Sequence, residues 1–311
     1  MRKPKLIISR CLNSEKCRYD GNGFDDKIIS LIRDYVDIET VCPESDIGLP
    51  MPRDPIRIEK DEDSYRLIQT KTNRDYSDMM TEFAEEFVSG IDDIDGFILK
   101  SRSPTCGIKD VKIYPKGKKC SIKNNGTGFF SAKVINKYTD IPIENEGRLK
   151  NYEIRDEFLT KIFTINDLKS EKSIKDFHKK NCLLLKSYDY KKAEQLDSIA
   201  GKDVLNDEDI DLYNKKVYEI LEKKRSRRSS IKAAQSAFVV YKNKLTEKEV
   251  TYFERLLDLY SEKKIPFSSV KTALEIYGLR FDDNDLLNQT FFNPYPEDLM
   301  SMSDSGKGRS L

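Results

Sequence analysis

The sequence predicts an α/β N-terminal domain, with a parallel or mixed sheet and flanking helices, followed by an all-α C-terminal domain. In roughly the first half, short apolar runs alternate with segments of helical periodicity, the order typical of β-α-β units. Beyond Arg155 glycine becomes rare, strand patterns disappear and helical periodicity continues. We therefore expect one domain at 1–165, a second at 172–303, and a flexible Ser- and Gly-rich tail at 304–311.

Short apolar runs mark the strands of the first domain. They lie at 6–9, 38–41, 65–69, 94–99 and 111–114, with a further short strand near Ile141. Apolar residues spaced three or four apart predict helices between these runs, at 24–35, 77–90 and 129–138. Ser77 is the expected cap of the second of these helices. The proline-rich segment 50–55 predicts an irregular loop.

The second domain shows clear helix boundaries. Thr246 and Glu249 have the spacing of a capping box, with an apolar stripe behind them. Pro266 precedes another segment of helical periodicity. The charged, Ser-containing segment 167–173 is the expected linker between the domains.

Composition restricts the class of protein. The chain has 311 residues, of which 35% are charged and 38% hydrophobic, and a net charge of +1. No run of 18 apolar residues and no signal-peptide pattern is present, so we expect a cytoplasmic protein with no membrane partner. In that compartment six cysteines indicate free thiols or metal ligands. The chain has a single histidine, His178, and this scarcity argues against a zinc site with imidazole ligands.

Three of the cysteines follow predicted strands. Cys11, Cys42 and Cys106 each lie in a loop that begins where an apolar run ends. Because the carboxyl ends of parallel strands meet at one edge of a sheet, their thiolates can converge. Such a site suits an iron–sulfur cluster, with zinc as the alternative. Cys17 is a candidate fourth ligand, although we favour a role in packing or sulfur relay. Cys120 and Cys182 carry no motif and are expected to be structural or incidental.

The cysteine motifs resemble those of a known family. In order, the chain shows Ser-x-Cys-Leu, Cys-Arg-Tyr-Asp-Gly, Cys-Pro-Glu and Ser-Pro-x-Cys-Gly, which resemble the thiouracil desulfidase family. The second half resembles the YbgA-like helical domain, with Phe177-His178-Lys179 near its start and the segment 286–296 at its end. The bridge at 144–149 is similar to that of the fused, two-domain members, which are themselves similar to the desulfidases that convert 4-thiouridine in tRNA to uridine.

The resemblance implies a chemistry for these residues. Cys11, Cys42 and Cys106 would hold a [4Fe–4S] cluster with one open iron site, which polarises a thiocarbonyl for attack by water. The overall change is hydrolytic, so no electron donor and no nucleotide cofactor is required. Glu44 would act as the base and Ser103 would orient water or substrate. The structural alternatives are that Glu44 caps a turn or pairs with Arg53 and that Ser103 starts a turn.

Two basic clusters bear on the substrate. They comprise Lys112, Lys116, Lys118 and Lys119 in the first domain, and Lys223, Lys224, Arg225, Arg227 and Arg228 in the second. Such runs are commonly solvated faces, but they also suit the phosphates of an RNA. We expect an enzyme that converts 4-thiouridine in tRNA to uridine. One alternative substrate is free 2-thiouracil or a thionucleoside, and a different class is a non-catalytic thiolate-metal protein that binds RNA or a protein partner.

Overall fold

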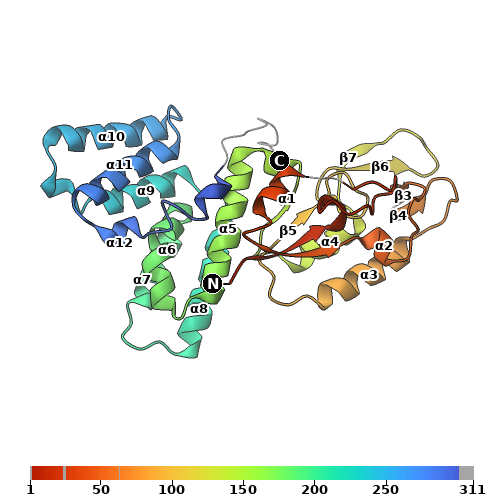
Figure 1. Ribbon diagram of the computed structural model, residues 1–311, viewed down its shortest axis with the longest axis horizontal. Helices are drawn as coiled ribbons and strands as arrows, with labels where there is room; N and C mark the ends of the chain where they lie inside the picture. Colours follow the sequence, from red (N-terminus) through yellow and green to blue (C-terminus); the bar gives the residue numbers. More distant parts are fainter. Residues whose placement is uncertain (1, 24–25, 63, 301–311) are drawn as a thin grey trace. The chain divides into compact units, whose positions relative to one another are not determined.

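The computed structural model describes residues 2–23, 26–62 and 64–300, which form two compact units (Figure 1). Unit 1 comprises the chain up to residue 158 together with 298–300, and unit 2 comprises 159–297. The division falls within the long helix α5 (Tyr152–Ser170). The tail expected at 304–311 and the first two residues of the helix expected at 24–35 lie outside the described residues. No helix in the described ranges has the length and apolar character needed to cross a membrane.

Unit 1 contains a fully parallel four-stranded sheet in the order β2-β1-β5-β8. Its strands are β1 (Lys5–Ser9), β2 (Asp37–Val41), β5 (Gly96–Leu99) and β8 (Ile143–Asn145). β1 and β5 are buried along almost their whole length, as expected for central strands covered on both faces. The predicted strands at 6–9, 38–41 and 94–99 correspond to β1, β2 and β5.

A second, mixed sheet has the order β4-β3-β6-β7. Its strands are β3 (Ile56–Asp61), β4 (Ser64–Gln69), β6 (Val111–Pro115) and β7 (Lys123–Gly126). β3 runs parallel to β6 and antiparallel to β4, and β6 runs antiparallel to β7. The prediction of a single sheet was therefore incomplete, because β3 and β7 were not expected from the sequence. β7 is almost entirely polar and belongs to the sheet through its backbone hydrogen bonds.

One hydrophobic core joins the two sheets of unit 1. It is built from alternate side chains of the second sheet, inward residues of β1 and β5, and the apolar faces of α3 (Ser77–Ser89) and α4 (Phe129–Lys137). Ser77 is the first residue of α3 and not its cap, because its hydroxyl accepts the Leu67 amide and donates to Asp75. The remaining helices are α1 (Lys27–Ile32), α2 (Pro43–Asp46), η1 (Arg10–Leu12) and η2 (Arg148–Lys150).

The described part of unit 2 is helical throughout, as predicted, and Figure 1 shows α10 and α11 lying side by side. Its elements are α6 (Ile174–Tyr188), α7 (Tyr190–Ala200), α8 (Asp207–Leu221), α9 (Arg227–Phe238), η3 (Lys242–Lys244), α10 (Glu247–Ser261), α11 (Phe267–Arg280) and α12 (Asn284–Leu287), and η4 (Glu297–Leu299) lies at the border with unit 1. The capping box of Thr246 and Glu249 is formed. The linker expected at 167–173 was wrong, since α5 extends through Ser170.

Candidate active site

Three of the predicted site cysteines lie at the same edge of the parallel sheet. Cys11 is in η1 directly after β1, Cys42 precedes α2 after β2, and Cys106 lies in the turn that follows β5. Because β1 is hydrogen-bonded to both β2 and β5, the carboxyl ends of these strands are neighbours. The three residues are 9%, 9% and 4% exposed, so the thiols are gathered in a buried site.

A fourth cysteine, Cys17, belongs to the same group. It is 3% exposed and its thiol is hydrogen-bonded to the thiols of both Cys11 and Cys42. Its backbone carbonyl also lies 3.7 Å from Cys42 Sγ. From the sequence, Cys17 was a candidate fourth ligand, but packing or sulfur relay was preferred because the family that the chain resembles does not use this cysteine as a ligand. The loop that follows η1 carries Cys17 back to the sheet edge.

Three of these thiols, those of Cys17, Cys42 and Cys106, have pKa values raised above that of an ordinary thiol. The hydrogen bond with Cys11 raises the pKa of Cys17 to about 11. The hydrogen bond with Cys17, together with burial, raises the pKa of Cys42. Burial raises the pKa of Cys106 to about 12, against the hydrogen bonds of Ser9 and Thr105, which lower it. Metal binding at these residues would therefore release protons. No three thiol, carboxylate or imidazole groups in the described ranges have the arrangement that holds a single metal ion.

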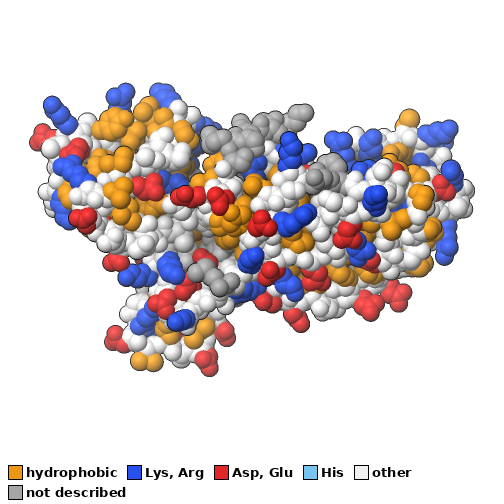
Figure 2. All heavy atoms as spheres, viewed as in Figure 1, with side chains coloured by type: hydrophobic (Ala, Val, Ile, Leu, Met, Phe, Trp, Pro, Cys, Tyr) orange, Lys and Arg blue, Asp and Glu red, His pale blue; other side chains and the backbone are white. Residues whose placement is uncertain are grey.

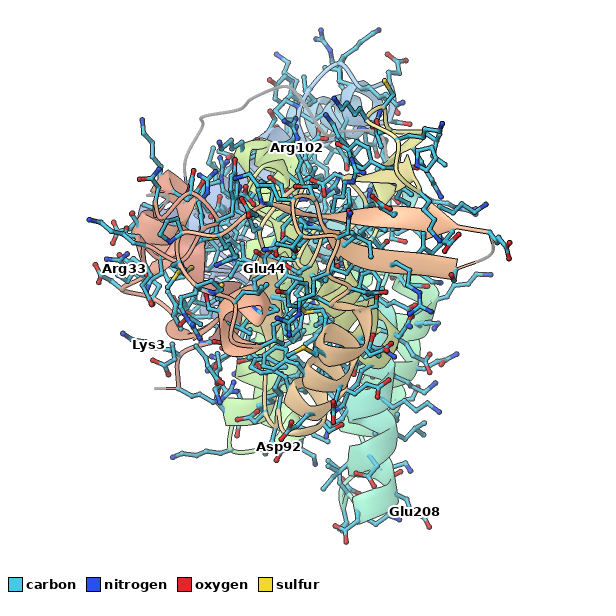
Figure 3. All side chains as sticks on the ribbon, turned by 90° about the vertical axis from the view of Figure 1, so that its right-hand side faces the viewer. Lys3, Arg33, Glu44, Asp92, Arg102 and Glu208 are labelled. Atoms are coloured by element: carbon cyan, nitrogen blue, oxygen red, sulfur yellow. The ribbon has the colours of Figure 1, made fainter. Side chains whose placement is uncertain are left out.

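Glu44 lies on α2, two residues after Cys42, and is labelled in Figure 3. Its Oε2 accepts hydrogen bonds from Arg53 Nε at 2.8 Å and Arg53 Nη2 at 2.6 Å. Its Oε1 accepts one from Thr105 Oγ1 at 3.1 Å. The pairing of Glu44 with Arg53 is therefore present, and the second carboxylate oxygen of Glu44 is bound to the turn that carries Cys106. Thr105, which the sequence did not single out, connects the two.

Ser103 shapes the turn that carries Cys106. Its hydroxyl accepts the amides of Thr105 at 3.2 Å and Cys106 at 3.1 Å, and shares a hydrogen bond with Thr105 Oγ1 at 2.9 Å. Ser103 thus reaches Glu44 through Thr105 and makes no direct contact with it in the described hydrogen bonds. Gly128 allows the start of α4 to pack on this turn, because a Cβ there would come within 2.4 Å of the Thr105 carbonyl oxygen.

The predicted RNA-binding residues differ in what they contact. In unit 1, Lys112 lies in β6 and Lys116, Lys118 and Lys119 lie in the turn between β6 and β7; all four are exposed, and Lys116 pairs with Asp61. Figure 2 shows Lys and Arg side chains over this part of the surface.

In unit 2, Lys223 pairs with the carboxylate of Asp189 at 3.3 Å, whereas Lys224 and Arg228 are exposed. Arg225 packs against the ring of Tyr188 at 5.1 Å, and Arg227 packs against that of Tyr260 at 4.5 Å. The two arginines therefore have structural contacts, which the charge run in the sequence did not indicate.

Two protein families and two individual proteins are similar to parts of this chain. A protein family described as "2-thiouracil desulfurase" matches residues 6–146, the range that contains every cysteine of the site. This part of the chain is therefore similar to proteins described as enzymes that remove sulfur from thiouracil. A protein family of unknown function, DUF1722, matches residues 182–296 and thus most of unit 2.

Two individual proteins are similar to part of the chain. The chain is 28% identical over 109 residues to the uncharacterized protein YbbK of Bacillus subtilis, covering 33% of this chain and 72% of YbbK. A solved structure described as the [4Fe–4S]-dependent thiouracil desulfidase TudS is 25% identical, covers 47% of this chain and 93% of its own, and has a TM-score of 0.37.

Proposed function

We propose that this chain is an iron–sulfur desulfidase that converts 4-thiouridine in tRNA to uridine. The observation that carries the proposal is the convergence of Cys11, Cys42, Cys106 and Cys17 at one sheet edge beside Glu44. Buried thiols in this number are the donors that iron–sulfur clusters use. We assign Cys11, Cys42 and Cys106 as the ligands, which leaves one iron open. When bound, the cluster would supply a Lewis acid for the sulfur of a thiocarbonyl.

The protein's own groups supply the proton transfer. Oε2 of Glu44 already accepts two hydrogen bonds from Arg53, whereas Oε1 accepts one from Thr105. Since each carboxylate oxygen can accept about two, Oε1 is the atom with capacity for a water molecule. Glu44 would take a proton from that water as its oxygen bonds to the thiocarbonyl carbon. A thiocarbonyl and water give a carbonyl and hydrogen sulfide, so no electrons are exchanged.

Features of unit 2 support an RNA substrate. Arg227 and Arg228 occupy the first turn of α9, which contains no acidic residue. Cations at the positive end of a helix dipole are unfavourable, and a phosphate placed there would relieve that repulsion. The exposed lysines of the β6–β7 turn offer further phosphate contacts in unit 1. We assign both groups to tRNA binding.

The experiment is anaerobic reconstitution with iron and sulfide, followed by incubation with thiolated tRNA and with free 2-thiouracil. Loss of thiocarbonyl absorbance from the tRNA, dependent on iron loading, is the expected result. Loss from the free base alone would retain the desulfidase chemistry and refute the tRNA assignment. The family description favours that second candidate, since it refers to thiouracil. No loss from either substrate, at full iron content, would contradict both.

A further inference from the structure

Arg53 is a buried arginine whose protein contacts use only part of its hydrogen-bonding capacity. Its side chain is 2% exposed. Nε and Nη2 donate to Glu44 Oε2, and Nη2 also donates to the carbonyl oxygen of Cys17 at 3.1 Å. Its third nitrogen, Nη1, is equally buried and has no hydrogen-bond partner among the described residues.

A buried donor on a charged group destabilises the protein unless something accepts its hydrogen bond. Native structures contain few such groups, and a ligand that completes the bonding is a common reason for them. The ion pair with Glu44 does not require Nη1, because Nε and Nη2 already make it. The pairing inside the protein therefore does not account for the unused nitrogen.

The contacts of Arg53 place Nη1 in the candidate active site. The guanidinium is planar, so Nη1 lies next to Nη2, which contacts Glu44 and the Cys17 carbonyl. The thiol of Cys17 is hydrogen-bonded to those of Cys11 and Cys42. A molecule that contacts Glu44 and the cysteines would thus lie close to Nη1 of Arg53.

We propose that Arg53 is a substrate-binding residue, whose Nη1 donates a hydrogen bond to the remaining carbonyl oxygen of the thiolated pyrimidine base. This inference rests on the proposed function and adds the part of the base that is recognised. A thiouracil carries its sulfur and its carbonyl oxygen on the two carbons that flank one ring nitrogen. With the thiocarbonyl directed to the cysteines, the carbonyl is the other strong acceptor that the ring offers.

The same contact favours the reaction. As water adds to the thiocarbonyl carbon, the electron pair of the C=S bond moves to the sulfur, so the reaction is favoured when this carbon is electron-poor. A fixed cationic donor at the carbonyl oxygen draws the electrons of the intervening nitrogen toward that oxygen, which makes the thiocarbonyl carbon more susceptible to attack by water. Glu44 and the substrate would then share one guanidinium, so that base and ring are held in a constant relative position.

The first test uses the unaltered holoenzyme and two substrates, 4-thiouracil and pyrimidine-4-thione, which lacks the second carbonyl. We expect kcat/KM for 4-thiouracil to be about 10- to 100-fold higher, the usual range for one charge-assisted hydrogen bond. Equal kcat/KM values would overturn the proposal, and this result needs no variant to fold.

The second test substitutes Arg53 by Lys and by Gln, with Arg57→Gln as the control. Arg57 is a neighbouring arginine of β3 that packs on Tyr114 and pairs with Glu59, away from Glu44. We expect both Arg53 variants to lose the preference for 4-thiouracil, so that the ratio of the two kcat/KM values approaches 1. The control should keep the ratio of the wild type. If the Arg53 variants lower kcat/KM for both substrates by the same factor, the proposed contact is refuted and the role of Arg53 is limited to positioning Glu44.

A binding measurement separates this inference from the proposed function. Uracil and pyrimidin-4-one, which differ by the same carbonyl, are titrated into the iron-loaded protein by calorimetry. Tighter binding of uracil that disappears in Arg53→Gln supports the contact even where no desulfuration occurs. Indistinguishable binding of the two compounds refutes the contact, whether or not the enzyme is active on thiolated tRNA.

Discussion

Thr105 Oγ1 donates a hydrogen bond to Glu44 Oε1 at 3.1 Å, which ties the turn carrying Cys106 to the helix that follows Cys42. The two residues come from loops at the ends of β5 and β2, on opposite sides of β1 in the sheet. The bond therefore holds the carboxylate in a fixed position relative to the thiols from all three strands.

Replacing Thr105 by Val removes this hydrogen bond at nearly constant volume. Hydrogen bonds to charged groups contribute about 1.5–3 kcal/mol, so we expect kcat on a free thiobase to fall by about 10- to 100-fold. Thr105→Ser is the matched control, since it retains the hydroxyl and should stay within a few-fold of the wild type. Steady-state kinetics at matched iron content measures both. An equal loss in the two variants would assign the effect to the packing of this side chain and not to its hydrogen bond.

Cys17 provides a test of which thiols hold iron. With Cys11, Cys42 and Cys106 as the ligands, Cys17→Ala should bind iron and sulfide in the same amounts as the wild type after anaerobic reconstitution. Cys42→Ala should lose most of both. The measurement is iron and sulfide content together with visible absorbance. Iron loss in Cys17→Ala that matches Cys42→Ala would make Cys17 a ligand and require the assignment to be revised.

Asp167 makes the stability of unit 2 depend on pH. Burial, and then the nearby Glu171, raise the pKa of Asp167 from 3.8 to about 6 in the folded protein. The protonated form is thus favoured by folding, and its stabilisation is complete below about pH 4 and lost as the pH rises through 6. Asp167→Asn carries no charge, so at pH 8 it should be more stable than the wild type by on the order of 2 kcal/mol.

Urea unfolding of the full chain at pH 4 and pH 8 measures this difference. Near pH 4 the variant and the wild type should be close to equal. Asp258→Asn, which changes an exposed aspartate of α10, is the control and should differ little from the wild type at either pH. A stabilisation by Asp167→Asn that is the same at both pH values would rule out the titration of Asp167 as the cause.

Substitution of two exposed basic residues, Lys224 just before α9 and Arg228 within it, tests whether this region binds tRNA. Lys224 and Arg228 are both exposed, whereas Arg225 and Arg227 pack on tyrosines, so the first two can be changed with less effect on folding. We expect Lys224→Gln with Arg228→Gln to weaken tRNA binding about tenfold and to reduce the slope of log K against log salt by about 2. Activity on free thiouracil should not change.

Filter binding at several salt concentrations measures the affinity and its slope. The matched control is Lys191→Gln with Lys248→Gln, which removes two exposed charges elsewhere in unit 2. A similar loss in the control pair would indicate a general charge effect and not a site at α9. An unchanged slope in the α9 pair would remove these residues from the proposed RNA contact.

The sequence allowed much of the fold to be predicted, and the exceptions have physical causes. β1 and β5 are continuous apolar runs, and α10 has a capping box, so local pattern and final structure agree. β7 is made of Lys123, two asparagines and Gly126, and no side-chain pattern marks a strand held by its backbone. The charged segment at 167–170 is the helical end of α5, so its charge did not mark a linker between helices.

By itself, the sequence determined the two-part organisation of the chain and the positions of Cys11, Cys42 and Cys106 at strand ends, because apolar periodicity is a local property. The tertiary structure alone decided that Cys17 joins these thiols and that Thr105 donates a hydrogen bond to Glu44. It also decided that one nitrogen of Arg53 has no hydrogen-bond partner among the residues that the structure describes. Those contacts join residues from separate loops, and their partners are set by the order of strands in the sheet. No spacing along the chain records that order.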